Sequence, residues 1–297
     1  MTLQAQSCTM GGRVFLESVF YVRQLRPGLC WVVMTMLHTS QYFSPNPNGI
    51  LAKTSTRWAV LLLHGFTAGP QSVLPWAQAL AHAGATVHVP LLSGHGTSVA
   101  DLARTTAGQW RRDVQHALDD LLSQGYDRVA VAGLSMGGTL ALDAASNRPV
   151  DAAFVVNPGL SFRPLDQLGV YLSPLMQWVI PTVGPLAGDV RKPGVTEGAY
   201  DRTPVAAVEQ LAKLFSVTRR HLADITAPVT LYWSPEDHIL PRSSARILRR
   251  GLEPHLLTTV ILEQSFHAAT LDYDAPLIDQ DSITTLQKLS GGQHATA

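Results

Sequence analysis

The sequence predicts a fold of the α/β class, in which helices cover both faces of a mostly parallel sheet. Short apolar segments alternate with segments of helical period between residues 58 and 262, which is the pattern of repeated strand–helix units. These apolar segments are continuous rather than alternating, as expected for strands that are buried on both faces. With 297 residues, 46% of them hydrophobic, the chain can form one large domain or two ordinary ones.

The individual elements are predicted from local patterns. The first strand is expected at 58–63, where the residues WAVLLL are continuously apolar. A helix is expected at 106–124, because Trp110, Val114 and Leu118 fall on one face of it. By the same reasoning, further strands are expected at 86–91, 128–132, 152–156, 229–233 and 258–262. Further helices are expected at 75–83 and 137–145.

The composition argues against several classes of protein. Lys and Arg together number 22, as do Asp and Glu, so the chain has no net charge and no basic stripe to follow a phosphate backbone. We therefore expect no nucleic-acid partner. Because its two cysteines are Cys8 and Cys30, residues 31–297 offer no thiol nucleophile and no cysteine-ligated metal. The sequence also lacks the motifs of zinc proteases, phosphate-binding loops and dinucleotide-binding folds, and we expect no metal and no cofactor.

Residues 1–50 are expected to form an N-terminal extension before the folded core, poorly ordered on one interpretation. Its apolar run at 29–37 is nine residues long, whereas a helix needs about 20 to cross a bilayer, so no integral membrane segment is predicted. Three interpretations stay open: a translation start at Met34 or Met36, a peripheral apolar helix, and a targeting segment. We expect a cytoplasmic protein, with secretion or peripheral membrane association through residues 13–37 as the alternatives.

The alternation of strands and helices is interrupted between residues 160 and 227. The roughly seventy residues there contain six prolines and scattered apolar side chains, and a structureless loop of that length is uncommon in a compact domain. We therefore predict an α/β core at 51–159 and 228–290, with a helical cap inserted at 160–227. The sequence leaves the oligomeric state open. The candidate substrate-binding residues of the cap are Leu172, Met176 and Trp178.

A nucleophile is predicted at Ser135. The residues GLSMG at 133–137 follow a predicted strand and open a predicted helix, which is the strand–turn–helix context of the G-x-S-x-G motif. The glycines permit a sharp turn that lifts the serine hydroxyl clear of the sheet, and the helix points its N-terminus towards the site. Because serine alone is a weak nucleophile, the site also needs a base and an acid that orients the base.

The base and the acid are expected at the ends of two later strands. Asp237 follows the fifth predicted strand and His267 follows the sixth, and such folds place active sites at the carboxyl ends of parallel strands. The neighbouring Glu236 is the rival acid. An oxyanion hole also needs two backbone N–H donors, which we expect from Met136, directly after the nucleophile, and from Phe66, in the loop after the first strand.

Five segments of the chain, in this order, resemble the α/β-hydrolase superfamily: HGFTAGPQS, LLSGHGT, GLSMGG, SPEDHILP and SFHAATLDYD. The chain is most similar to small bacterial carboxylesterases and monoacylglycerol lipases, over about residues 58–273. Ala68 and Ser234 depart from the pattern of the family, which often has glycine at these places. The resemblance implies a catalytic triad of Ser135, Asp237 and His267, with backbone oxyanion donors at Phe66 and Met136.

The function implied by this resemblance is a serine hydrolase that cleaves carboxylic esters through an acyl-enzyme. Its partner would be a small-molecule acyl ester, as for a carboxylesterase or a monoacylglycerol lipase. Other chemistries on the same fold stay open, namely a lyase, a C–C bond hydrolase, an acyltransferase or a cofactor-free haloperoxidase, because fold does not determine function. A non-enzymatic ligand receptor is the third alternative. Labelling by a fluorophosphonate separates it from the enzymes, because only an activated serine reacts.

Overall fold

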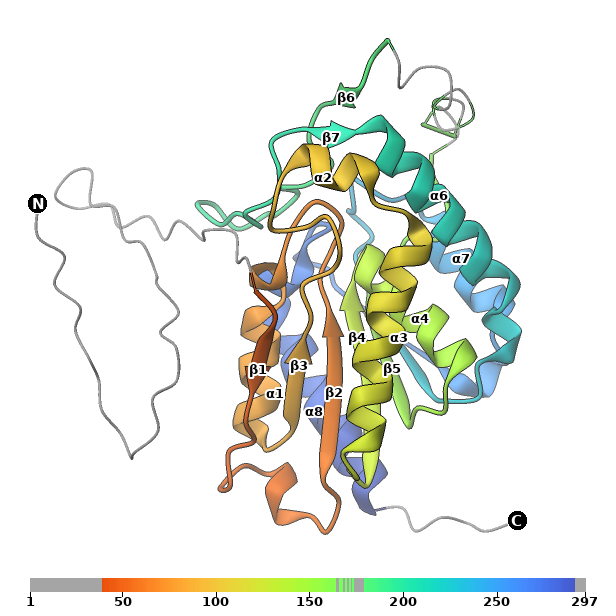
Figure 1. The fold of residues 1–297 in the computed structure, drawn as a ribbon. Helices are drawn as coiled ribbons and strands as arrows, with labels where there is room; N and C mark the ends of the chain where they lie inside the picture. The colour runs from red at the N-terminus through yellow and green to blue at the C-terminus, as the bar shows by residue number, and fades with distance from the viewer. Residues whose placement is uncertain are drawn as a thin grey trace, which may run out of the picture.

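The fold is built on a seven-stranded sheet in the order β1-β3-β2-β4-β5-β8-β9 (Figure 1). The computed structural model describes residues 39–163, 166, 167, 169, 171, 173 and 179–291. All neighbouring strands run parallel except β1, which is antiparallel to β3 at one edge. The strands are β1 (Gln41–Phe43), β2 (Trp58–Leu63), β3 (Thr86–Val89), β4 (Arg128–Leu134), β5 (Ala152–Val156), β8 (Val229–Trp233) and β9 (Leu257–Ile261).

Helices cover both faces of this sheet, as the sequence predicts. Successive residues of a strand point to opposite faces, so Val60 and Leu62 pack with α1 and α8, while Leu61 and Leu63 pack with α3 and α4. The sheet is therefore buried on both sides, which explains its continuously apolar strands. The helices are α1 (Leu74–Ala83), α2 (Val99–Arg104), α3 (Ala107–Ser123), α4 (Met136–Asn147), α6 (Val205–Arg220), α7 (Ser243–Gly251) and α8 (Ala275–Gly291).

All six predicted strands and all three predicted helices are confirmed, with small differences at their ends. Strand β3 stops at Val89, two residues before the predicted end. Pro90 explains this difference, because proline has no N–H to donate to a neighbouring strand. Helix α3 begins after Thr106, whose hydroxyl accepts the N–H of Gln109 while the Gln109 side chain accepts the N–H of Thr106. Helices α2, α7 and α8 and the edge strand β1 were not predicted, and α6 was expected only as part of the helical cap.

The described part of residues 160–227 contains a two-stranded antiparallel sheet and a long helix. Strands β6 (Thr182–Val183) and β7 (Thr203–Pro204) pair with each other, and α6 follows β7 directly. Strands β6 and β7, the start of α6 and helix α2 lie beyond the carboxyl ends of the parallel strands, and the rest of α6 runs down beside α4 (Figure 1). The predicted contact residues Leu172, Met176 and Trp178 lie outside the described residues, as do residues 13–37 and the rest of 1–38.

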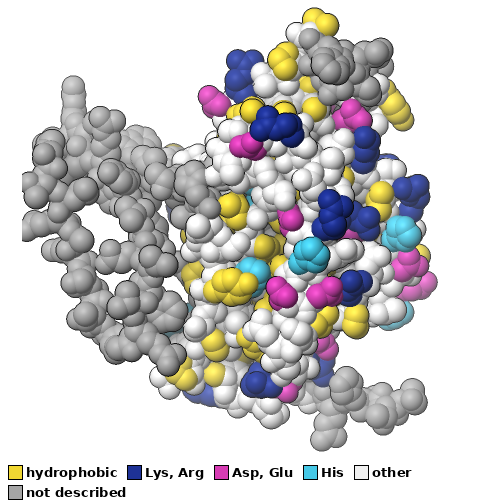
Figure 2. Space-filling view, in the orientation of Figure 1, with side chains coloured by type: hydrophobic (Ala, Val, Ile, Leu, Met, Phe, Trp, Pro, Cys, Tyr) yellow, Lys and Arg dark blue, Asp and Glu magenta, His cyan; other side chains and the backbone are white. Residues whose placement is uncertain are grey.

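The described surface carries charges of both signs. In Figure 2, Lys and Arg side chains lie among Asp and Glu side chains on the face that is shown. Across the residues that the structure describes, no helix is both long and apolar enough to cross a bilayer. Within the same residues, no group of three or more His, Cys, Asp or Glu side chains is placed to hold a metal ion.

Candidate active site

Ser135 occupies a sharp turn between β4 and α4. Its backbone has φ 56° and ψ −115°, a strained conformation for a residue with a side chain. The turn is close-packed: a Cβ on Gly133 would lie 2.3 Å from the carbonyl carbon of Gly137, and a Cβ on Gly137 would lie 2.1 Å from the carbonyl oxygen of Leu63. Both glycines are therefore required by the geometry of the turn, and Ser135 lies at the N-terminus of α4.

His267 and Asp237 form a buried pair. Nδ1 of His267 lies 2.8 Å from Oδ2 of Asp237, and the two side chains are 4% and 6% exposed. The other carboxylate oxygen, Oδ1, accepts the backbone N–H groups of Ile239 and Leu240, each at 2.8 Å. Three hydrogen bonds thus hold the carboxylate in one orientation, with one oxygen facing the imidazole.

The pKa shifts of this pair have opposite signs. Burial acts to raise the pKa of Asp237, but the charge and hydrogen bond of His267, helped by the two backbone N–H groups, lower it below its usual value. Burial acts to lower the pKa of His267, but the carboxylates of Asp237, Glu197 and Asp189 raise it above its usual value. The imidazole is therefore a stronger base than an ordinary histidine.

Asn157, directly after β5, connects the ends of β8 and β9 beside this site. The N–H of Ser135 donates to the carbonyl of Val156, the last residue of β5 and the one before Asn157, at 2.9 Å. The Asn157 side chain donates to the carbonyl of His267 at 2.9 Å and accepts the N–H of Ser234 at 2.8 Å. The backbones of the predicted nucleophile and base are thus fixed to adjacent residues. Asn157 was not predicted from the sequence, although a polar residue directly after a buried strand is a signal for such a role.

Ser234, where the family pattern often has glycine, also forms part of these contacts. Its hydroxyl donates to the carbonyl of Phe266 at 2.9 Å, next to His267. A glycine at this position would lack that hydrogen bond between the loops that carry the acid and the base.

The loop after β2 is held by a buried histidine. The Nδ1 of His64 donates to the carbonyl of Gly65 at 3.0 Å, and its Nε2 accepts the N–H of Leu92 at 3.2 Å. Burial lowers the pKa of His64 to about 4, so the ring is neutral near pH 7 and can play both roles. The fixed loop carries Phe66, while Met136 is the first residue of α4, where backbone N–H groups lack partners within the helix.

Glu236 and Glu197, two further acids near the pair, differ in exposure. Glu236 is 53% exposed and makes an ion pair with Arg191 at 3.4 Å, on the solvent side. Glu197 is 3% exposed, and its Oε1 accepts the N–H of Gly188 at 2.9 Å. Burial raises the pKa of Glu197, although the charge of His267 acts against this. Sequence reasoning missed Glu197, because nothing in its local pattern distinguishes it from a surface glutamate.

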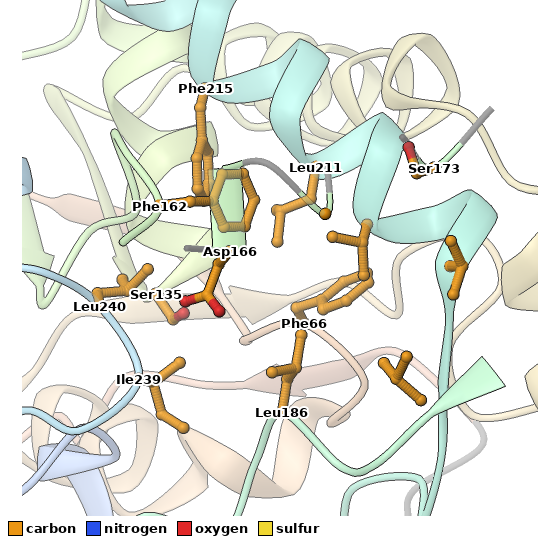
Figure 3. Close-up of a pocket in the computed structure, with 14 residues that line it drawn as sticks. Phe66, Ser135, Phe162, Asp166, Ser173, Leu186, Leu211, Phe215, Ile239 and Leu240 are labelled. Atoms are coloured by element: carbon orange, nitrogen blue, oxygen red, sulfur yellow. The ribbon is translucent and has the colours of Figure 1, made fainter. Parts of the chain in front are cut away.

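An apolar cavity of about 290 Å³ opens onto Ser135 (Figure 3). Helix α6 forms one wall, and Asp166, Ile239 and Leu240 lie on the same side of the cavity as the serine. The carboxylate of Asp166 and the hydroxyl of Ser173 are the polar exceptions in a mostly apolar lining. The apolar lining includes Phe162, Leu186, Val208, Leu211, Phe215 and Leu240.

Residues 60–279 match the model of the alpha/beta hydrolase family. The chain belongs to this family. It is 38% identical over 233 residues to a thermostable monoacylglycerol lipase of Bacillus sp. (strain H-257), a match that covers 78% of this chain and 91% of that lipase. It is 26% identical over 235 residues to a carboxylesterase of Bacillus subtilis (strain 168), covering 78% of this chain and 93% of the esterase.

Solved structures of lipolytic enzymes have the same fold. A structure from work on the metagenome-derived lipolytic enzymes LipS and LipT superimposes with a TM-score of 0.76 and 30% identity, over 86% of this chain and all of that one. The monoacylglycerol lipase of Paleococcus ferrophilus superimposes with a TM-score of 0.69 and 18% identity, over 86% of this chain and 100% of its own. At that identity, the second likeness concerns the fold alone.

Proposed function

We propose that this alpha/beta hydrolase cleaves carboxylic esters, as a carboxylesterase or monoacylglycerol lipase, through an acyl-enzyme on Ser135. Its class is supported by 38% identity to a bacterial monoacylglycerol lipase over most of both chains. The observation that carries the residue assignment is the 2.8 Å contact between His267 and Asp237, buried at the same end of the sheet as the Ser135 turn.

The reaction follows from the roles that these groups can play. Ser135 Oγ attacks the ester carbonyl while Nε2 of His267 takes the hydroxyl proton, and Asp237 stabilises the imidazolium through its bond to Nδ1. The backbone N–H groups of Phe66 and Met136 stabilise the oxyanion, and loss of one such donor typically costs about 10²–10³ in kcat. The imidazolium then protonates the leaving alcohol. A water molecule, activated by His267, attacks the acyl-enzyme and releases the acid.

The acyl chain would occupy the apolar cavity beside Ser135. Its mostly apolar lining favours a hydrocarbon chain over a sugar or a highly charged acyl group. We also propose that residues 160–227 act as a cap over the core of 51–159 and 228–290, because α6 supplies one wall of this cavity.

Fluorophosphonate labelling combined with an ester hydrolysis panel tests this function. The wild-type protein should be labelled on Ser135 and should hydrolyse p-nitrophenyl esters and monoacylglycerols. Ser135→Ala should abolish labelling and lower kcat by several powers of ten. Ser146→Ala, at the far end of α4, is the matched control and should behave as the wild type. Retention of more than about a tenth of the activity in Ser135→Ala would rule out this nucleophile.

A further inference from the structure

Asp189, between β6 and β7, contacts both loops that carry the Asp237–His267 pair. Its Oδ2 accepts the backbone N–H of His267 at 3.1 Å and that of His238, the neighbour of Asp237, at 3.0 Å. Its Oδ1 accepts the Nδ1–H of the His238 ring at 2.8 Å. The Asp189 side chain is only 12% exposed, and these contacts use both of its oxygens. A carboxylate from outside the two loops therefore holds them together.

A second carboxylate fixes the segment that carries Asp189. Asp272, in the loop after β9, accepts the N–H of Arg191 at 2.7 Å and the N–H of Phe266 at 3.0 Å. In the reverse direction, the N–H of Ala268 donates to the carbonyl of Asp189 at 3.1 Å. The loop of His267 and the segment of Asp189 are thus bonded to each other at Ala268 and at Asp272, which limits their relative movement.

We propose that Asp189 is a positioning residue for the catalytic base, acting through the backbone of His267 and the loop of Asp237. This inference rests on the proposed function, because it gives Asp189 a part in the same reaction. A hydrogen bond at the N–H of His267 fixes the point from which the imidazole projects, and the bond at His238 fixes the loop of its acid partner. A displacement of about 1 Å in a catalytic group can cost about a hundredfold in rate.

The negative charge of Asp189 also acts on the imidazole. Burial acts to lower the pKa of His267, and the carboxylates of Asp237, Glu197 and Asp189 raise it above the ordinary value. Glu197 and Asp189 belong to the segment between β6 and β7, whereas Asp237 lies after β8. The His238 ring, which is 59% exposed, faces Asp189 from the solvent side. Two carboxylates outside the proposed triad therefore help to stabilise the imidazolium that forms during acylation.

Asp189→Asn tests this role, with Asp127→Asn as the matched control. Asp127 also accepts a backbone N–H, that of Arg57 at 2.7 Å, but it precedes β4 and so lies at the opposite end of the sheet. An asparagine has one acceptor oxygen and no charge, so it can keep only part of the contacts of Asp189. For Asp189→Asn we expect kcat to fall at least tenfold while KM stays within threefold of the wild type. The acid limb of the pH profile of kcat/KM should move to lower pH, because one of the carboxylates that raise the pKa of His267 is lost. The control should change kcat less than twofold and leave the limb in place.

Two further variants keep the test decisive if Asp189→Asn does not fold. Asp189→Glu retains the charge but moves the carboxylate by one methylene, so kcat should fall at least fivefold while the acid limb stays. His238→Gln retains Asp189 and both backbone donors, so kcat should stay within threefold of the wild type. Wild-type kcat in Asp189→Glu, or an unmoved acid limb in folded Asp189→Asn, would overturn the positioning role. An unlabelled, inactive wild-type protein would instead contradict the proposed function.

Discussion

Oδ2 of Asp237 lies 2.8 Å from Nδ1 of His267, and neither side chain is more than 6% exposed. In such a buried setting their attraction is screened far less than it would be at the surface. Because the other oxygen of Asp237 is held by two backbone N–H groups, the carboxylate cannot turn away from the ring. This pairing leaves Nε2 of His267 free to act on a substrate, which is the state that a general base requires.

Asp237→Asn should lower kcat at least a hundredfold, whereas Glu236→Gln should lower it less than about fivefold. The asparagine keeps the shape but stabilises the wrong tautomer of His267, a change that cost about 10⁴ in a serine protease. Glu236 is the matched control, because it is adjacent in the chain but 53% exposed and paired with Arg191. Steady-state kinetics on one p-nitrophenyl ester compare the two. A larger loss of kcat in the Glu236 variant than in the Asp237 variant would mean that Asp237 is not the acid of the triad.

The acid limb of kcat/KM should have its midpoint above 6.5. His267 must be neutral to accept the serine proton, and its pKa is raised above the ordinary histidine value of about 6.5 because neighbouring carboxylates outweigh its burial. Activity is therefore lost as the pH falls through this raised pKa and recovered as the pH rises. His64 cannot produce the same limb, since burial lowers its pKa to about 4. Hydrolysis followed in a pH-stat measures the midpoint, and a value at or below 6.5 would contradict the assignment.

The fold was predictable because its strands carry their signal locally. A strand buried on both faces is a continuous apolar run, so β2, β5 and β8 were predicted with the bounds that they have in the structure. Helix α6 was expected only as part of a helical cap and not as an individual helix, because the six prolines before it dominate the pattern and its apolar face meets α4 rather than the sheet. The edge strand β1 was missed because three residues are too short for any periodic signal.

The residues of the candidate site also differ in whether the sequence could predict them. Ser135, Asp237 and His267 were predicted because each lies in the loop or turn that follows a recognisable strand, and parallel topology brings such positions to one edge. Asp189 and Glu197 lie in a segment without a regular pattern, 78 and 70 residues before His267. Their importance depends on a backbone N–H and a buried position that only the folded chain creates. No periodicity or motif encodes contacts of that kind.

Gly137→Ala should destabilise the protein by about 1–3 kcal/mol, as overpacking in a close-packed interior does. The added Cβ would lie 2.1 Å from the carbonyl oxygen of Leu63 and 2.6 Å from that of His64, so either the Ser135 turn or the β2 loop must move. The same displacement should lower kcat at least tenfold. Gly184→Ala is the control, because a Cβ there meets no atom within 4 Å. Urea unfolding measures the free energy of unfolding of both variants. An equal value for Gly137→Ala and Gly184→Ala would contradict the close packing of the turn.

Asp279→Asn should stabilise the protein at pH 8 by about 2 kcal/mol. This figure is smaller than the full difference in pKa would give, because the side chain is only half-buried and solvent screens its charge. Burial raises the pKa of Asp279 from 3.8 to about 7. The folded state thus binds the proton more tightly than the unfolded chain, and this stability is lost as the pH rises from 3.8 through 7. Asparagine stays neutral throughout, so the two proteins should differ little at pH 4. If the free energies of unfolding of the wild type and Asp279→Asn, measured in urea, differ by the same amount at every pH, the effect arises from packing and not from charge.

The kcat/KM for ester hydrolysis should rise with acyl-chain length from acetate towards medium-chain esters and then level off. Each methylene buried in the cavity contributes up to about 0.8 kcal/mol, or roughly fourfold in kcat/KM, until the space is filled. Val208→Trp should shift the optimum to shorter chains, because Val208 lines the cavity on α6, while acetate hydrolysis should stay within threefold. Lys213→Trp, on the exposed side of the same helix, should leave the series unchanged. A flat series from acetate to octanoate in the wild type would mean that the acyl chain binds elsewhere.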